Sequence, residues 1–199
     1  MSSAKKIGLG VVGVALVVVA GGYLLPAQTT VERSIEVQAP VQTVYHLVNN
    51  LKENEKWSTW KEQDPTVKTT YSAQAEGVGA SSSWDGEKMK TGSMTITDAK
   101  ENESIVLALD FGAQGKAQSA FSFEGTEKGT KVTWNFVSNN GNNPIKRYMG
   151  ALVGKNMIGK AFDHGLENLK RVSEQTVASQ QPSQGPEAAA PAAATNATN

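Results

Sequence analysis

The chain has 199 residues, and 19 lysines and arginines balance 19 aspartates and glutamates, so its formal net charge is zero. It has no cysteine, which excludes disulfides and thiolate chemistry, and its two histidines leave no metal-ligand spacing. No basic stripe of the kind that binds nucleic acids is present, so we expect no nucleic-acid partner. We also expect no metal and no cofactor.

A short basic N-terminus, residues 1–6 with Lys5 and Lys6, precedes the uncharged run IGLGVVGVALVVVAGGYLL at residues 7–25. As a helix, this run is about 30 Å long, which matches the hydrocarbon core of a bilayer, so it predicts a single-pass transmembrane anchor. Basic residues stay on the cytoplasmic side, so the domain that follows is expected to be extracytoplasmic, on the periplasmic side of the inner membrane in a Gram-negative cell. A cleaved signal peptide is the alternative, with a passable cleavage site at Ala20.

Glycines 8, 10 and 13 in this run spell the dinucleotide-binding pattern G-x-G-x-x-G. That pattern functions only between a strand and a helix of a βαβ unit. Here only six residues precede it and the surroundings are membrane-apolar, so we reject a dinucleotide site. Glycines are also common where membrane helices pack.

Residues 27–174 form the predicted domain, and residues 175–199 form a predicted disordered tail. The tail holds one charge and one large aliphatic residue among Ala, Pro, Gln, Ser and Thr, too little apolar surface to offset its ordering entropy. The sequence Asn-Ala-Thr at residues 196–198 matches a glycosylation acceptor, which is weak evidence in such a tail.

The domain begins with a strand, because Val31, Ile35 and Val37 alternate with polar residues. Pro40 suits the first turn of a helix that runs to about Leu51. A short polar helix at residues 52–56 then leads into a turn with two tryptophans.

Six strands follow, each with apolar residues at every second position and each separated from the next by a short turn, which predicts an antiparallel sheet. After a Gly/Asn loop, Pro144 opens a helical region whose later part carries a long apolar stripe. The stripe residues are Ile158, Phe162, Leu166, Leu169 and Val172. The order predicts an α+β fold in which a curved antiparallel sheet wraps one long C-terminal helix, and the gap between them is the natural ligand site.

Four segments in this order carry a family resemblance: VERSIEVQAPVQTVYHLVNNLKENEKWSTW, SSSWDG with TGSMTIT, GTKVTWNF, and YMGALVGKNMIGKAFDHGLENLK. The chain resembles the START-like or SRPBCC superfamily, in its polyketide cyclase/dehydrase-type branch, over residues 31–171. The resemblance implies a helix-grip fold with a cavity for hydrophobic or amphipathic small molecules. The branch has no universal catalytic signature, so no catalytic residue is carried over.

The histidines are the obvious candidates for a general base. His46 falls off the apolar stripe of its helix, and His164 lies two positions after Phe162, so both are expected on outer faces. The triple serine at residues 81–83 has no paired base, and we assign no catalytic residues.

The aromatic residues are the better candidates for a site. Core packing is the simpler interpretation for Phe123 and Trp134, whereas Trp57 and Trp60 are placed for a lid whose indole N–H groups meet water. Arg33 shares a face with apolar neighbours, either as a rim side chain or as a contact for an acidic head group. The expected cavity lining is Trp57, Trp60, Tyr71, Trp84, Met94, Phe111, Phe123, Trp134, Tyr148 and Phe162.

Three functions remain open. The first, which we favour, is a non-catalytic, membrane-tethered binder of a hydrophobic molecule or lipid. The second is an enzyme that cyclises or dehydrates a polyketide-like substrate. The third is a protein-interaction module with a filled lumen. A cavity of at least about 300 Å³ distinguishes the first two from the third.

Overall fold

The computed structural model describes residue 17 and residues 19–180. Within these residues no helix is both long and apolar enough to cross a bilayer. Most of the predicted anchor, the glycine pattern within it and the tail beyond residue 180 lie outside the described residues. The described end of the anchor segment is helical at residues 19–24.

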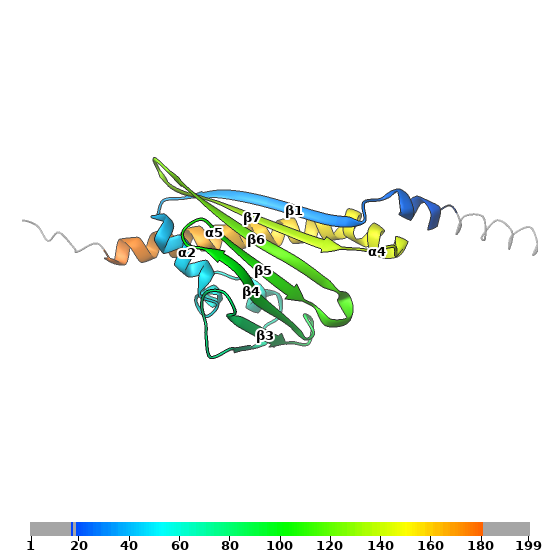
Figure 1. Ribbon diagram of the computed structural model, residues 1–199, viewed down its shortest axis with the longest axis horizontal. Helices are drawn as coiled ribbons and strands as arrows, with labels where there is room; N and C mark the ends of the chain where they lie inside the picture. The colour runs from blue at the N-terminus through cyan, green and yellow to red at the C-terminus, as the bar shows by residue number, and fades with distance from the viewer. Residues whose placement is uncertain (1–16, 18, 181–199) are drawn as a thin grey trace, which may run out of the picture.

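The sheet has seven strands, all of them paired antiparallel in the spatial order β1-β7-β6-β5-β4-β3-β2. β1 does not pair with β2, the next strand in the sequence. It pairs instead with the last strand, β7, over its whole length. Figure 1 shows the curved sheet with the long helix α5 lying along it. The predicted antiparallel sheet on a C-terminal helix is confirmed. The strands are β1 (Gln28–Val37), β2 (Lys68–Tyr71), β3 (Ser81–Asp85), β4 (Gly92–Lys100), β5 (Ser104–Asp110), β6 (Lys116–Thr126) and β7 (Gly129–Asn139).

The helices fill the remaining segments, and α5 is the longest of them. Pro40 precedes α2 as expected, and Asn143 caps α4 by accepting hydrogen bonds from the backbone N–H groups of Ile145 and Lys146. The helical segments are α2 (Val41–Asn49), η1 (Glu53–Lys56), α3 (Trp60–Gln63), η2 (Gly112–Gln114), α4 (Pro144–Tyr148), the π-helix η3 (Met149–Gly154) and α5 (Lys155–Gln180).

The long helix continues six residues past the expected domain boundary at Glu174. Val177, the single large aliphatic residue of the supposed tail, packs against the main hydrophobic cluster. The Glu174 carboxylate also accepts a hydrogen bond from the backbone N–H of Gln38 at 2.9 Å. The structure thus has residues 175–180 in α5, in the segment for which the sequence predicts a disordered tail.

The hydrophobic core is closely packed at only one end of the domain, the end at which α2 lies. Where α2 crosses the sheet, Leu166 and Leu169 of α5 belong to one closed cluster with Ile105 and Val132, all of them almost fully buried. Toward the first turns of α5, a second and smaller cluster contains Phe162. The predicted gap between helix and sheet lies at this second end.

Candidate functional site

A cavity of about 360 Å³ lies between the first half of α5 and the sheet. Most of its lining is apolar. Its wall comprises Asn54, Trp57, Thr59, Trp60, Gln63, Lys88, Met89, Met94, Leu107, Leu109, Phe111, Gln114, Ser119, Phe121, Trp134, Phe136, Met157, Ile158, Ala161 and Phe162.

Strand periodicity explains how the sheet supplies its share of the wall. Leu107 and Leu109 alternate along β5, and each is buried, whereas Ala108 between them is exposed on the opposite face. Neighbouring strands repeat the pattern, because residues two apart on a strand share a face. The helix supplies Ile158 and Phe162, which are four residues apart and therefore lie on one side of α5.

A stack of aromatic rings forms part of the cavity wall. The rings of Trp134 and Phe162 lie parallel with centroids 3.7 Å apart, and Phe121 also stacks on Trp134, with centroids 4.8 Å apart. The Trp134 indole N–H donates to Ser119 Oγ at 2.7 Å, so the polar atom of the ring is satisfied inside the sheet. Trp134 therefore packs against the hydrophobic core and also lines the cavity.

Trp57 does not act as the expected lid. Its side chain is 2% exposed, and its indole N–H donates to the backbone oxygen of Leu47 at 2.9 Å instead of meeting water. Its ring lies edge-on to Trp134 and Phe121, so it forms part of the inner wall. Trp60 is more exposed and stacks on Trp84, with centroids 5.8 Å apart.

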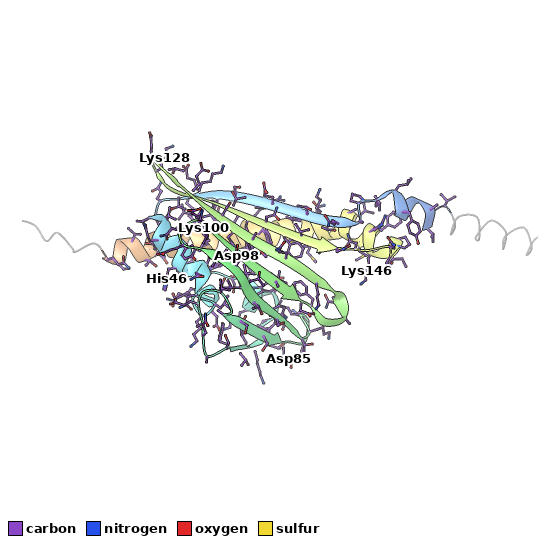
Figure 2. The ribbon with its side chains drawn as sticks, in the orientation of Figure 1. His46, Asp85, Asp98, Lys100, Lys128 and Lys146 are labelled. Atoms are coloured by element: carbon purple, nitrogen blue, oxygen red, sulfur yellow. The ribbon has the colours of Figure 1, made fainter. Side chains whose placement is uncertain are left out.

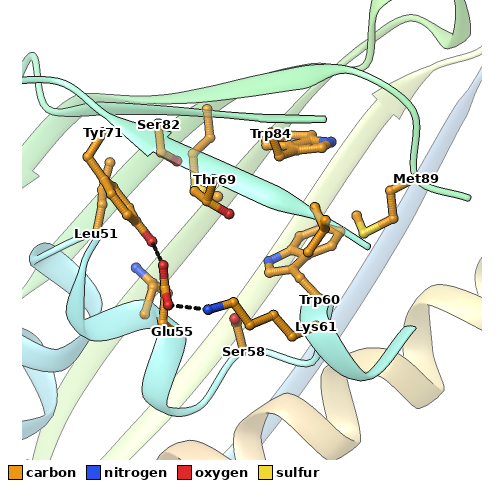
Figure 3. A pocket seen from close by; sticks show the side chains of 13 residues that line it. Leu51, Glu55, Ser58, Trp60, Lys61, Thr69, Tyr71, Ser82, Trp84 and Met89 are labelled. Atoms are coloured by element: carbon orange, nitrogen blue, oxygen red, sulfur yellow. Dashed lines mark hydrogen bonds and ion pairs between the residues drawn. The ribbon is translucent and has the colours of Figure 1, made fainter. Parts of the chain in front are cut away.

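A side cavity of about 30 Å³ adjoins the main one and shares Asn54, Trp60, Met89 and Met94 with it. In Figure 3 the Tyr71 hydroxyl points at Glu55, to which it donates at 2.6 Å, and Lys61 donates to the same carboxylate at 2.5 Å. The hydrogen bond from Lys61, and next that from Tyr71, lower the pKa of Glu55. Burial, together with the bond to Glu55, raises the pKa of Tyr71 far above its usual value, so this hydroxyl stays protonated.

The structure places the ten aromatic and methionine candidates in three groups. Tyr71 and Trp84 line the side cavity. Phe123 packs edge-on to Tyr45 of α2 in the closed core, and Tyr148 lies against Gly21 at the end of the domain, so these two line neither cavity. The remaining six, Trp57, Trp60, Met94, Phe111, Trp134 and Phe162, line the main cavity.

Arg33 does not line either cavity. Its Nε lies 2.9 Å from the Asp163 carboxylate, and its guanidinium lies over Gly159, where a Cβ atom would be 2.4 Å from Nη2. The side chain therefore ties β1 to α5 on the outside of the domain. The cation that lies on the wall of the main cavity is Lys88, which the sequence patterns did not single out.

Asp64 holds the turn that carries Lys88. The Asp64 carboxylate is fully buried and accepts backbone hydrogen bonds from Lys88 at 2.8 Å and Met89 at 3.0 Å. It also accepts from the side chain of Thr66 at 2.5 Å, and these hydrogen bonds, led by that of Thr66, lower the pKa of Asp64 strongly. Asp64 followed two residues later by Thr66 is a local signal for such a turn, but the contact with Lys88 is not readable from the sequence.

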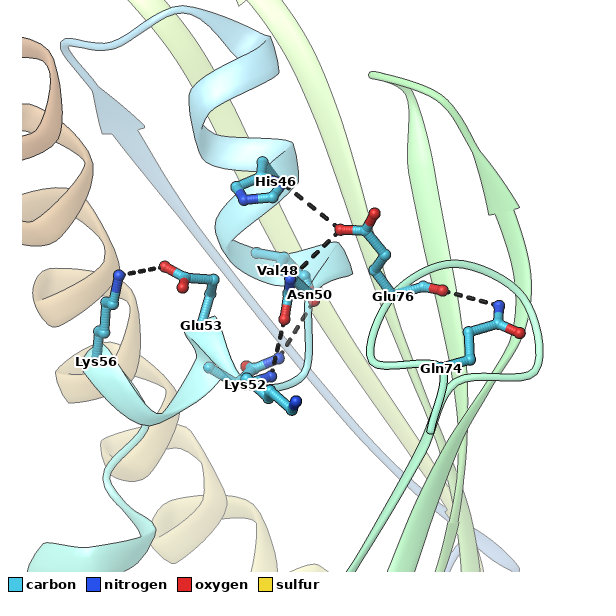
Figure 4. Close-up of polar contacts among 9 residues, drawn as sticks. His46, Val48, Asn50, Lys52, Glu53, Lys56, Gln74 and Glu76 are labelled. Atoms are coloured by element: carbon cyan, nitrogen blue, oxygen red, sulfur yellow. Dashed lines mark hydrogen bonds and ion pairs between the residues drawn. The ribbon is translucent and has the colours of Figure 1, made fainter. Parts of the chain in front are cut away.

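Both histidines are on the surface, as expected. His46 Nδ1 lies 3.9 Å from Glu76, a carboxylate that also accepts a hydrogen bond from Asn50, and Figure 4 shows the three side chains together outside the core. His164 lies 3.4 Å from Glu62. Neither histidine lines a cavity.

Residues 28–174 match the family model described as polyketide cyclase/dehydrase and lipid transport. The chain belongs to this family. The match spans the seven strands in the described part of the chain and all but the last turns of α5. No match was found among the curated proteins.

Solved structures share the fold at low sequence identity. A protein of unknown function from Staphylococcus aureus, SA2116, has a TM-score of 0.59 at 11% identity, with 76% of this chain and 96% of that chain covered. Protein CV1439 from Chromobacterium violaceum has a TM-score of 0.55 at 11% identity, covering 73% and 98%. The di-domain ARO/CYC StfQ from the steffimycin biosynthetic pathway has a TM-score of 0.56 at 12% identity, covering 76% and 52%.

Proposed function

We propose that this protein binds a hydrophobic or amphipathic small molecule in the main cavity without transforming it, and that residues 7–25 tether it to a membrane. The observation that supports binding is the cavity itself, which at about 360 Å³ has the volume of a small-molecule site and a mainly apolar wall. The family description, which includes lipid transport, fits the same ligand class.

The composition of the wall favours binding over catalysis. Among the described residues that line the main cavity, none is an aspartate, glutamate, histidine or tyrosine, so no pair of side chains there can exchange a proton with a substrate. Lys88 is the single titratable side chain of that wall. A cyclase or dehydrase reaction of the kind that the family description names would have to use this lysine or groups of the substrate.

Lys88 also suits an amphipathic ligand. It is exposed at the wall of a mainly apolar cavity, on the turn fixed by Asp64. A ligand with an apolar body between α5 and the sheet and an acidic head at Lys88 would satisfy both environments. Lys88 thus takes the role of head-group contact, which was one of the two alternatives considered for Arg33.

The location is part of the same proposal. Residues 7–25 are uncharged and follow Lys5 and Lys6, which supports an anchor with its N-terminus in the cytoplasm and the cavity on the other side. A reporter enzyme fused after Val172 is expected to be active only when exported. Activity of a reporter that works only in the cytoplasm would contradict this orientation.

The binding test uses a fluorescent fatty acid and the full chain in detergent. Ala161→Trp places a large ring in the main cavity, and Ala108→Trp places the same ring on the exposed face of β5. We expect one fluorophore per wild-type chain at micromolar concentration, binding weakened at least tenfold by Ala161→Trp, and no change with Ala108→Trp. No binding to a well-folded wild-type chain would favour the interaction module.

A further inference from the structure

Exposed apolar side chains are concentrated at one end of the domain. Of the nine large apolar side chains that are exposed in the described part of the chain, eight belong to residues 17–24 or to the segment from α4 to the first turn of α5. The ninth, Val78, lies in the loop between β2 and β3. We call the following set the apolar end surface: Tyr23, Leu24, Ile145, Met149, Leu152 and Met157, with exposed fractions of 53–89%.

Specific contacts join the two segments of this surface. Arg147 donates from Nη1 to the backbone oxygens of Tyr23 at 2.9 Å and Leu25 at 3.2 Å, and its guanidinium lies 5.7 Å from the centre of the Tyr23 ring. Gly21 and Gly22 permit the close approach, since a Cβ on Gly22 would be 2.5 Å from Pro144. The surface is therefore assembled by tertiary contacts where the predicted anchor ends.

The π-helix η3 presses its inner side onto the sheet and leaves apolar side chains outside. A Cβ on Gly150 would be 2.2 Å from Thr29 Oγ1 of β1, so only glycine allows this approach. Met149 and Leu152 in the same segment are 56% and 65% exposed. Single π-turns are rare and recur at functional sites, which is consistent with a surface kept apolar for a partner.

The charges of the same segment all have one sign. From residue 140 to residue 162 the sequence contains Lys146, Arg147, Lys155 and Lys160 and no aspartate or glutamate. Lys146, Lys155 and Lys160 are exposed. In Figure 2 Lys146 projects from α4, whereas Lys128 lies at the β6–β7 hairpin at the opposite end of the domain. Exposed apolar side chains among basic ones are the composition of segments that lie on anionic membrane surfaces.

The main cavity reaches this surface. Met157 is 64% exposed in the apolar end surface, and it also lines the cavity beside Ile158 and Ala161. We propose that the apolar end surface rests on a bilayer with anionic headgroups, so that the cavity exchanges its ligand with the lipid phase rather than with water. This inference rests on the proposed binding function for the role of the cavity. It adds a second membrane contact, made by Ile145, Met149, Leu152 and Met157, next to the end of the proposed anchor at Tyr23 and Leu24.

The test uses the full chain in vesicles of phosphatidylcholine and phosphatidylglycerol, with a nitroxide-labelled phosphatidylcholine as quencher. Because the chain has no cysteine, Leu152→Cys and Val78→Cys each provide a single site for a fluorescent label. The two native side chains are comparably exposed, at 65% and 55%. We expect lipid quenching of the label at position 152 and none at position 78, at all protein-to-lipid ratios.

Charge reversal and ligand binding complete the test. The triple change Lys146→Glu, Lys155→Glu and Lys160→Glu should reduce quenching at position 152 severalfold, and Lys128→Glu at the opposite end should leave it unchanged. Absence of quenching at position 152, or label burial that disappears on protein dilution, overturns the proposal in favour of a protein partner or a second copy. The same vesicles also test the proposed function by itself. Absence of fatty-acid binding there would contradict the proposed binding function, whatever the quenching at position 152.

Discussion

The rings of Trp134 and Phe162 lie parallel, with centroids 3.7 Å apart and an angle of 9° between their planes. This pair marks the point along α5 where the closed hydrophobic core ends and the main cavity begins. On one side of it Leu166 and Leu169 are almost fully buried, and on the other side Ile158 and Ala161 line open space.

Removal of the Phe162 ring should therefore affect both stability and binding. Phe162→Ala is expected to lower the free energy of unfolding by about 3–5 kcal/mol, the usual cost of truncating a buried phenylalanine. It should also lengthen the cavity and improve the relative affinity for longer acyl chains. Urea denaturation and titration with fatty acids of increasing length measure the two effects, and Phe162→Leu serves as the milder control. If Phe162→Ala left the preference for fatty-acid chain length unchanged, Phe162 would not form the boundary between the closed core and the cavity.

Substitution of Lys88 should change ligand selectivity rather than stability. With Lys88→Met we expect affinity for a fatty acid to fall severalfold and affinity for the corresponding fatty alcohol to stay the same, because only the acid carries a charge. Added salt should reduce the difference between the two ligands in the wild type. Arg33→Met, which alters the cation outside the cavity, is the control. Equal loss for acid and alcohol would show that Lys88 acts through packing.

The buried carboxylate of Asp64 should make stability depend on pH. Its pKa is lowered in the folded state by hydrogen bonds, so its contribution is complete above the pKa of the unfolded chain and is lost as pH falls through the lower, folded pKa. Asp64→Asn should lower the melting temperature by several degrees at neutral pH. The gap to the wild type should narrow as pH falls below about 4, the ordinary aspartate pKa. If the difference in melting temperature did not depend on pH, the charge of the Asp64 carboxylate would not contribute to stability.

The histidines should be dispensable. His46→Ala and His164→Ala each remove an exposed contact between an imidazole and a glutamate, which contributes less than about 1 kcal/mol. We expect both variants to keep their melting temperature and fatty-acid affinity. A large loss of turnover on a polyketide-like substrate in either variant, with folding preserved, would instead identify the protein as an enzyme.

The last turns of α5 should contribute to stability. A chain that ends after Gln180 is expected to melt as the full chain does, whereas one that ends after Glu174 should melt a few degrees lower, because it loses the packing of Val177. Val177→Ala in the full chain should cost about 1 kcal/mol, from the removal of two partly buried carbon atoms. Identical melting of the two truncated chains would show that the contact of Val177 is marginal.

The alternation of residues along each strand was enough to predict the sheet, because face parity is a local property. It was not enough to place Phe123. That residue shares a face with Phe121 but lies two positions nearer α2, where Tyr45 covers it. The alternation of side chains thus identifies which residues face the inside of the sheet. It does not tell which of these inner residues lie next to the cavity and which lie in the closed core.

Contacts between distant segments explain the other differences. Trp57 lies in a polar turn by sequence, yet Leu47 provides a buried acceptor for its indole N–H. Lys88 reaches the cavity wall only because Asp64, 24 residues earlier, binds its backbone. Tyr148 looks like a cavity residue from its spacing but lies against Gly21. No local pattern encodes these pairings.

The open sheet has two free edges, β1 and β2, and proteins concentrated on a membrane would be exposed to edge-to-edge aggregation. The edge strand β2 has only four residues, too few to template a long foreign strand. The longer edge strand β1 carries Glu32, Arg33 and Glu36, and α5 packs beside it. These features disfavour sheet-to-sheet joining of neighbouring copies, including copies that the proposed anchor would concentrate on one bilayer.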